Sequence, residues 1–349
     1  MCPLANELKT RENINTVVCV TGQHRQMLDG VLKAFGVIPD YNLDIMKEGQ
    51  TLSDITANIL CGMDGVLDEV RPDSVLVHGD TSTTFATALS CFYKRVPVGH
   101  IEAGLRTYNI YSPYPEEFNR RAVSVIASCH FAPTKSAAEN LLREGVCRED
   151  IYITGNTVVD ALKTTVREDY MHPELDWAGG SRLVIVTAHR RENLGEPMRR
   201  MMRAIRRVSY ECEDVKIIYP IHMNPAVRTI AEQELGGCES IRLTEPLDVV
   251  DFHNFLARSY MILTDSGGVQ EEAAALRKPV LVMRDTTERP EGIKSGVLRL
   301  VGTDEDNIYK SFKRLLDDED DYKSMTLADN PYGDGTACKM ISDILSNRA

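Results

Sequence analysis

Three carboxylate side chains in the first half of the sequence stand where strands are expected to end or a helix to begin. Asp80 ends the run VLVHGD, Glu102 follows VPVGHI, and Glu116 opens an expected helix after Pro115. The carboxyl ends of parallel strands meet at one edge of a sheet, so these carboxylates are expected to face one crevice. Arg120 stands one turn after Glu116 and shares its helix face. The group could supply bases for proton transfer.

Taken singly, each of these residues also has a structural interpretation. Asp80 could cap the helix that begins near Thr81, and Glu116 with Arg120 could form an exposed ion pair. Convergence of three carboxylates on one crevice favours the catalytic interpretation.

A phosphate site is indicated by Thr264-Asp265-Ser266-Gly267-Gly268, which lies between an expected strand and helix. Two glycines let a ligand approach the backbone, and free amides at a helix start bind anions. Glu271 and Glu272 suit hydroxyl groups such as those of a ribose. An ordinary strand-turn-helix accounts for the pattern equally well. No G-x-G-x-x-G follows a strand and no Walker lysine motif occurs, so the sequence does not predict a nicotinamide site.

Three further candidates lie in the second half. His189 follows the run LVIVT and could contact a diphosphate or donate a proton, or belong to a polar turn that Asn193 caps. Arg289 could contact an anion or a hydroxyl group, or be a solvated loop charge. His222 follows another expected strand, and alone it reads as structural.

Composition limits the class of protein. The 349 residues are 43% hydrophobic and 26% charged, which is typical of a soluble protein of two domains. No apolar run approaches the ~18 residues of a membrane span. The net charge of -12 argues against general binding of nucleic acid or anionic membranes. The nine cysteines form no Cys-x-x-Cys pair, so we expect no zinc site and a reducing, cytoplasmic location.

Short β-branched runs alternate with helical stretches, which predicts an α/β protein with parallel sheets covered by helices. A polar stretch at 171–181 is the expected linker, after which the pattern restarts, so a ligand cleft is expected between two similar halves. The expected strands are 16–21, 74–78, 96–101, 152–154, 183–187, 215–220, 261–264, 280–283 and 298–301. The expected helices are 3–9, 25–35, 52–70, 81–94, 116–128, 196–208, one from Val269, 308–316 and 337–345.

The first expected element, Pro3–Lys9, is a helix with no strand before it. Such a half leaves an apolar opening in its sheet, with unpaired backbone edges on both sides. Either the strand order is unusual or the chain is truncated, and we favour truncation.

Eight strings of the sequence together carry a family resemblance. They are VHGDTSTT, GHIEAGLRT, YPEEFNRR, ITGNTVVDAL, TAHRREN, YPIHMNP, LTDSGGVQEEA and VMRDTTERPE. In this order, from about Val17 to the C-terminus, the chain resembles the non-hydrolysing UDP-N-acetylglucosamine 2-epimerases. The resemblance implies two Rossmann-like domains in the glycosyltransferase-B architecture. It also implies interconversion of UDP-N-acetylglucosamine and UDP-N-acetylmannosamine for polysaccharide biosynthesis, with no cofactor and no metal.

The resemblance assigns roles to individual residues. Asp80, Glu102, Glu116, Arg120 and His189 fall on catalytic positions. Ser266, Gly267, Gly268, Glu272 and Arg289 fall on UDP contacts, and Phe252 flanks the uracil. Gln23, Gln26, Arg190 and His222 fall on a site where a second substrate molecule acts as activator in some members. The implied domains are 1–172 and 173–335, with a helix at 336–349 that returns to the first domain, and a homodimer is expected.

The sequence departs from the family at its start. Members begin with a strand and a loop Gly-Thr-Arg-Pro-Glu-Ala-Ile-Lys, whose Arg and Lys reach the nucleotide and the reaction centre. This chain begins after that loop, at Met1-Cys2-Pro3. We hypothesise an overlooked upstream start, without which the chain would be unstable or nearly inactive.

The implied mechanism is an elimination. The hydrogen on the second carbon of the sugar is not acidic, so loss of UDP to give a glycal, followed by re-addition, is the feasible route without a nicotinamide. Three rivals remain: a glycosyltransferase of the same fold, an inactive UDP-sugar-binding pseudoenzyme, and a hydrolysing relative that releases N-acetylmannosamine.

Overall fold

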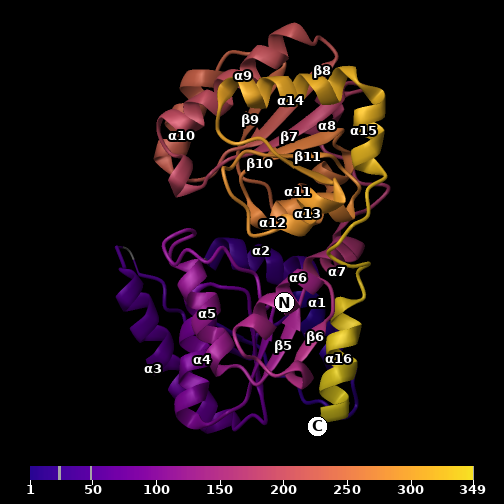
Figure 1. The fold of residues 1–349 in the computed structure, drawn as a ribbon. Helices are drawn as coiled ribbons and strands as arrows, with labels where there is room; N and C mark the ends of the chain where they lie inside the picture. The colour runs from indigo at the N-terminus through magenta and orange to yellow at the C-terminus, as the bar shows by residue number, and fades with distance from the viewer. Residues whose placement is uncertain (23–24, 48, 349) are drawn as a thin grey trace. The chain divides into compact units, whose positions relative to one another are not determined.

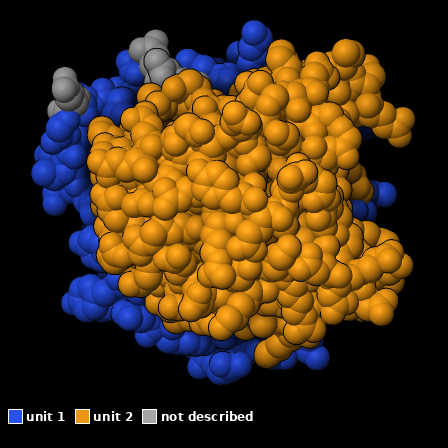
Figure 2. All heavy atoms as spheres, turned by 90° about the horizontal axis from the view of Figure 1, so that it is seen from above, with its two compact units in different colours: residues 1–161, 333–349 blue, residues 162–332 orange. Residues whose placement is uncertain are grey.

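The computed structural model of the chain describes residues 1–22, 25–47 and 49–348. The chain forms two compact units, coloured blue and orange in Figure 2: unit 1 is residues 1–161 with 333–349, and unit 2 is residues 162–332. Each unit contains parallel strands and helices, which confirms the α/β class (Figure 1). The compact units divide the chain after Ala161 and after Tyr332. The domain boundaries expected at residues 172 and 335 stay a prediction.

The strands of unit 1 form two separate parallel sheets. One has the order β3-β4-β5-β6, and the other is the pair β1-β2. In the described residues no ladder joins β1 to β3, as expected for a half whose first element is a helix. The strand expected at 16–21 is only two residues long, because β1 pairs with a neighbour on one side alone. The bounds are β1 (Cys19–Val20), β2 (Tyr41–Asn42), β3 (Val75–His78), β4 (Val98–Ile101), β5 (Cys129–Ala132) and β6 (Ile151–Ile153).

The helices of unit 1 begin and end at recognisable residues. For example, Thr51 and Asp54 form a capping box at the start of α3, and Arg71 ends it in a left-handed conformation. The bounds are α1 (Cys2–Lys9), α2 (Arg25–Phe35), α3 (Leu52–Val70), α4 (Ser82–Lys94), α5 (Glu116–Ile126), α6 (Lys135–Arg143), η1 (Arg148–Asp150), α7 (Thr157–Thr165) and α16 (Ala337–Arg348). The last residues of α7, 162–165, belong to unit 2.

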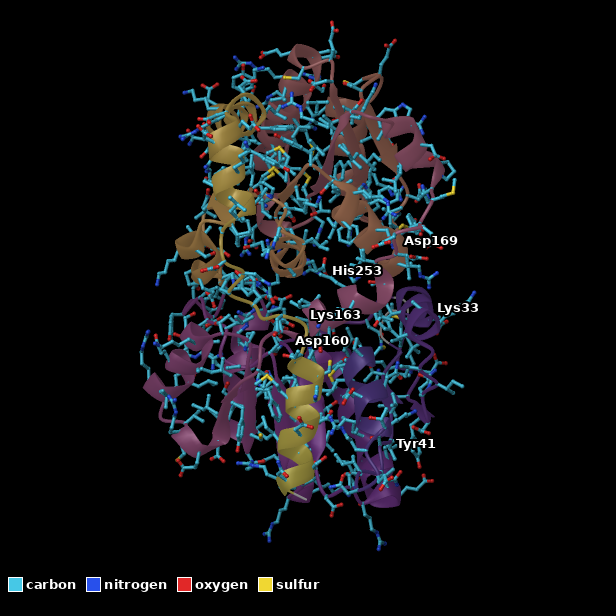
Figure 3. The ribbon with its side chains drawn as sticks, turned by 90° about the vertical axis from the view of Figure 1, so that its right-hand side faces the viewer. Lys33, Tyr41, Asp160, Lys163, Asp169 and His253 are labelled. Carbon is cyan, nitrogen blue, oxygen red and sulfur yellow. The ribbon has the colours of Figure 1, made fainter. Side chains whose placement is uncertain are left out.

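The C-terminal helix α16 belongs to the core of unit 1. It packs beside α1, and Leu4 and Leu8 share a buried cluster with Ile341 and with Phe131 of β5. The carboxylate of Asp160, labelled in Figure 3, accepts hydrogen bonds of 3.2 and 2.9 Å from the first two amides of α16. This cap fixes where the helix begins.

Unit 2 is built on one parallel sheet with the order β12-β11-β10-β7-β8-β9. Numbered within the unit, this is the 3-2-1-4-5-6 order of a Rossmann-like domain, and the connections reverse direction between β7 and β10. Ligands of such sheets bind outside the carboxyl ends of the strands at this switch point. The bounds are β7 (Arg182–Thr187), β8 (Val215–Pro220), β9 (Ile241–Thr244), β10 (Met261–Thr264), β11 (Val280–Val282) and β12 (Leu298–Leu300).

Successive side chains of the strands in unit 2 point to opposite faces of the sheet, so the core of the unit lies on both faces. Val184 and Val186 of β7 pack with Met201 of α9 and Phe312 of α14, whereas Leu183 and Ile185 do not belong to that cluster. The expected linker 171–181 contains a short helix, α8. The bounds are α8 (Pro173–Ala178), η2 (Arg191–Asn193), α9 (Glu196–Glu211), α10 (Pro225–Leu235), α11 (Val249–Arg258), α12 (Gly267–Ala275), α13 (Pro290–Ser295), α14 (Glu305–Asp317) and α15 (Glu319–Thr326).

Two histidines are buried in the sheet of unit 1. His100 of β4 and His130 of β5 are partners in the strand register and are 0% and 1% exposed. Burial lowers the pKa of His100 to about 3 and that of His130 to about 4. In the unfolded chain both return to a pKa near 6.5, so below that pH the unfolded state binds more protons than the folded state.

We therefore expect the free energy of unfolding of unit 1 to fall as the pH drops below about 6.5, with a slope of up to about 1.4 kcal/mol per pH unit for each histidine. His130→Asn removes one titrating group, so its slope should be smaller than that of the wild type. Denaturant unfolding at several pH values between about 7 and 5 measures both slopes. Equal slopes would contradict the assignment.

Candidate functional site

Asp80 is held by helix α5. After β3 the chain turns through Gly79 at φ 68°, and the carboxylate of Asp80 forms an ion pair with Arg120, whose side chain is 4% exposed. The side-chain amide of Asn119 donates a 2.9 Å hydrogen bond to the Asp80 carbonyl oxygen. An exposed pair of Glu116 with Arg120 is therefore the wrong interpretation, because Arg120 is buried and its partner is Asp80.

Glu102 lies beside the same turn. It follows β4 at φ 63°, a left-handed conformation that is uncommon outside glycine and often marks functional positions. Its carboxylate accepts a 3.2 Å hydrogen bond from Asn156 and lies 3.8 Å from Nδ1 of His78. A Cβ atom on Gly79 would lie 3.0 Å from Glu102 Oε2, and the left-handed φ of 68° also favours glycine at this turn. The structure thus brings Glu102 next to the segment that carries Asp80.

The two glutamates at the start of α5 differ in environment. Glu117 is fully buried and accepts 3.0 Å hydrogen bonds from the amides of Thr107 and Tyr108, and it lies 3.5 Å from Nη1 of Arg120. It anchors the loop between β4 and α5, a role that the sequence analysis missed. Glu116 is half-buried.

In unit 2 a buried carboxylate connects the two strands of the switch point. Asp265 follows β10 and is 0% exposed. Its oxygens accept hydrogen bonds from the amides of His189 (3.1 Å) and Arg190 (2.9 Å), which follow β7, and from the side chain of Asn193 (3.0 Å). Asp265 therefore fixes the segment after β7 against the segment after β10. It was not among the predicted site residues.

His189 is half-buried at this edge of the sheet. Its ring stacks on that of His222, with centroids 5.3 Å apart and planes 17° apart. Burial lowers the pKa of His189, and the neighbouring charge of Asp265, 3.8 Å from Nδ1, opposes that effect only in part. Near neutral pH the ring is therefore uncharged and carries one N–H. Arg190 and His222 lie beside it, whereas Gln23 and the side chain of Gln26 lie outside the described residues.

The start of α12 offers an anion site at the same edge. Ser266 occupies the cap position and makes no side-chain cap hydrogen bond, while Gly268 is exposed. The first amides of a helix lack intrahelical acceptors, and the helix dipole places partial positive charge there. A phosphate group could accept from these amides.

Arg289 packs under this helix start. A Cβ atom on Gly267 would lie 2.5 Å from Nη1 of Arg289 and 2.8 Å from Oε1 of Glu288. The guanidinium is held by Glu271 (2.5 Å) and Glu288 (2.6 Å), and all three side chains are buried. Glu271 and Glu288 balance the charge of Arg289, so Arg289 supports the structure around the helix start. The amides at the start of α12 are the groups that remain to bind an anion.

The two remaining predicted UDP contacts lie on adjacent helices. Phe252 is half-buried on α11, and Glu272 is half-buried on α12, with which α11 is in contact. The structure therefore groups Phe252 and Glu272 with Ser266, Gly267, Gly268 and Arg289 in unit 2.

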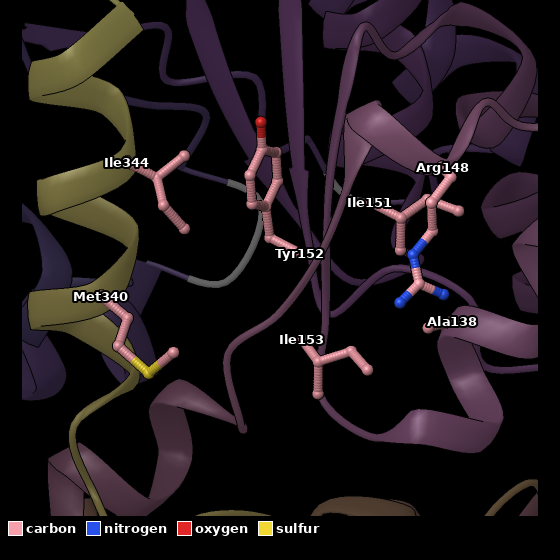
Figure 4. Close-up of a pocket in the computed structure, with 7 residues that line it drawn as sticks. All are labelled: Ala138, Arg148, Ile151, Tyr152, Ile153, Met340 and Ile344. Atoms are coloured by element: carbon pink, nitrogen blue, oxygen red, sulfur yellow. The ribbon is translucent and has the colours of Figure 1, made fainter.

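A pocket of about 260 Å³ in unit 1 stands apart from these residues (Figure 4). None of its lining side chains was predicted as a site residue. They come from α6, the segment around β6, and α16: Ala138, Arg148, Ile151, Tyr152, Ile153, Met340 and Ile344. Within the described residues, no three His, Cys, Asp or Glu side chains are grouped so that they could hold a metal ion.

Known proteins resemble the chain over nearly its whole length. The family model described as UDP-N-acetylglucosamine 2-epimerase matches residues 6–346. A UDP-N-acetylglucosamine 2-epimerase of Bacillus subtilis (strain 168) is 57% identical over 345 residues, which are 99% of this chain and 91% of that protein. The S. aureus MnaA–UDP co-structure has a TM-score of 0.96 and 50% identity, with 100% of this chain and 92% of that chain covered. The UDP-GlcNAc 2-epimerase from Neisseria meningitidis bound to UDP-GlcNAc has a TM-score of 0.95 and 44% identity, with coverages of 99% and 96%.

The two adjacent glycines of α12 give a matched test of this packing. Gly267→Ala must displace the buried Arg289 and Glu288, so we expect a loss of about 1–3 kcal/mol in stability. Gly268→Ala meets nothing within 4 Å and should be neutral or gain up to about 1 kcal/mol from helix propensity. Denaturant unfolding compares the two, and equal effects would contradict the described contact.

Proposed function

Because the chain belongs to the UDP-N-acetylglucosamine 2-epimerase family, we propose that its two groups of site residues act on one bound UDP-sugar. The chain has the two-domain α/β fold of that family, which is of the glycosyltransferase-B type. The reaction is the interconversion of UDP-N-acetylglucosamine and UDP-N-acetylmannosamine. Two carboxylates at adjacent strand ends of unit 1, Asp80 and Glu102, carry the proposal, since inversion at a carbon requires proton transfer on both faces.

The reaction proceeds as an elimination followed by an addition. A base removes the proton from the second carbon of the sugar, the C–H electron pair becomes a C1=C2 double bond, and the C1–O pair leaves with UDP. UDP then adds back to C1 while a proton reaches the opposite face of C2. Asp80, Glu102 and Glu116 are the candidate bases, and Arg120 holds Asp80 in place.

The leaving diphosphate is stabilised in unit 2. Ser266, Gly267 and Gly268 present the amides of the α12 start, and the uncharged His189 can donate one hydrogen bond without adding a full charge. Fixed donors of this kind stabilise charge that develops in the transition state. Phe252, Glu272 and Arg289 belong to the uridine part of the site.

A second UDP-N-acetylglucosamine molecule acts as activator in the same proposal. Arg190 and His222 lie next to His189, so a ligand on them would touch the group that faces the leaving diphosphate. Gln23 and Gln26 complete the expected contacts. In this way occupancy of the activator site could change the turnover.

The enzyme is an isomerase that retains its product as a UDP-sugar. Since UDP must return to C1, the glycal and UDP have to stay bound together, and water must not capture the sugar. A hydrolysing relative would instead release free N-acetylmannosamine.

Incubation with UDP-N-acetylglucosamine in heavy water, followed by NMR, tests the function. We expect UDP-N-acetylmannosamine with solvent deuterium on C2, and deuterium in the recovered substrate as well. Asp80→Asn and Glu102→Gln should each reduce the exchange by about a hundredfold or more. Transfer of the sugar to an acceptor, free N-acetylmannosamine, or binding of UDP without exchange would each overturn the proposal in favour of a rival.

A homodimer is a second part of the proposal. Neighbouring helices α4 and α5 expose Phe92 (59%), Phe118 (49%) and Val125 (88%), and exposed apolar side chains gathered in this way mark interaction surfaces. Light scattering should give about twice the mass of 39.0 kDa, and Val125→Glu should lower it. Met171→Glu, at a residue that is 80% exposed in unit 2, is the control. The mass of one chain for the wild type would contradict the dimer.

We place the enzyme in the cytoplasm. All nine cysteines are free thiols, which suits a reducing compartment. In the part of the chain that the structure describes, no helix is both long and apolar enough to cross a membrane. Recovery of the protein in an extracellular fraction of its source cells would contradict this location.

A further inference from the structure

A buried histidine of unit 2 contacts one of the residues assigned to the nucleotide. His253 lies on α11 (Figure 3) and is 3% exposed. Its Nδ1 is 2.7 Å from the hydroxyl group of Thr165, and its Nε2 is 3.6 Å from Oε1 of Glu272. The ring therefore connects the end of α7 with α12.

In this series of contacts, Thr165 is held firmly in place. Thr165 is 1% exposed, and the side-chain amide of Asn254 donates a 2.8 Å hydrogen bond to its carbonyl oxygen. Asn254 is itself fully buried and also bonds within α11. Because Thr165 is buried and hydrogen-bonded through its backbone, its hydroxyl group sets the orientation of the His253 ring.

Glu272 determines which nitrogen of the His253 ring carries the hydrogen. A carboxylate only accepts hydrogen bonds, so an imidazole nitrogen that faces it carries a hydrogen. The separation of 3.6 Å is longer than a hydrogen bond, so the contact orients the carboxylate electrostatically and leaves it able to move toward a ligand.

The other oxygen of Glu272 is not satisfied by the described residues. Oε2 is buried, and in the described part of the chain it has no hydrogen-bond partner, although the side chain as a whole is 13% exposed. A buried carboxylate oxygen without a donor is costly, and a hydroxyl group of a ligand would remove that cost. Glu272 thus has one oxygen near His253 and one for which the described residues supply no donor.

We propose that His253 is a positioning residue which aims Glu272 at the ribose hydroxyl groups and so sets the preference for ribonucleotides. The inference rests on the proposed function, in which Glu272 contacts the uridine. Without the ring, the carboxylate could turn to other rotamers, and the hydrogen bond to the ribose would lose its fixed direction.

Calorimetric binding of UDP, 2′-deoxy-UDP and 3′-deoxy-UDP to the full chain tests the proposal. The wild type should prefer UDP over at least one deoxy analogue by roughly tenfold or more, the value of a hydrogen bond to a charged group. His253→Asn keeps a polar atom near Thr165 but loses the one facing Glu272, so the preference should fall to about threefold or less. His253→Gln places an amide nitrogen near the Nε2 position and should restore most of it.

Two further variants separate the possible failures. Glu272→Gln should weaken the preference if Glu272 contacts the ribose, whatever His253 does. If Glu272→Gln weakens it while His253→Asn and His253→Gln both match the wild type, the inference about His253 is wrong and the proposed function stands. If the wild type binds UDP and both deoxy analogues equally, the ribose contact itself fails.

Should His253→Asn not fold, Thr165→Val carries the same test. It removes the hydroxyl group that orients the ring and keeps the volume, so the preference for UDP should fall by a few fold while melting shows an intact protein. A folded Thr165→Val with the preference of the wild type would overturn the proposal.

Discussion

The site of unit 2 depends on the buried carboxylate of Asp265. It stands where the strand order reverses, and its oxygens accept from the amides of His189 and Arg190 and from Asn193. A buried carboxylate that lost these donors would cost several kcal/mol, about as much as breaking a buried ion pair. The segment after β7 is therefore tied to the helix start after β10. As a result, the ring of His189 and the amides of α12 are presented at one edge of the sheet.

Unit 1 achieves the same rigidity with an ion pair. Arg120 is buried between Asp80 and Glu117, and Glu117 in turn holds the loop that precedes α5. A carboxylate fixed in this way needs little reorganisation when a proton is transferred, which is where much of the rate of such enzymes arises. Each unit thus uses a buried charge to fix the orientation of the side chains and backbone around it.

The sequence predicted the bounds of a strand best where the strand is long or apolar. The runs 215–220 and 261–264 were predicted with their final bounds, because both are buried strands limited by polar turns. Strand β5 (Cys129–Ala132) was missed, since four residues centred on a histidine show no β-branched run. The pair of Asp80 with Arg120 spans forty positions, so spacing could not reveal it. Asp265 could have been found, as an acidic residue directly after a short strand whose first three residues are apolar.

The central claim is that the bond between UDP and the sugar breaks and re-forms in the site. The most direct measurement uses UDP-N-acetylglucosamine with ¹⁸O in the oxygen that joins C1 to the β-phosphate. If UDP leaves and returns, rotation of the free β-phosphate distributes the label over its non-bridging oxygens, and the ³¹P NMR spectra of both epimers should show it there. Epimerisation with the label kept wholly in the bridge would contradict the account, because the bond to UDP would then have stayed intact.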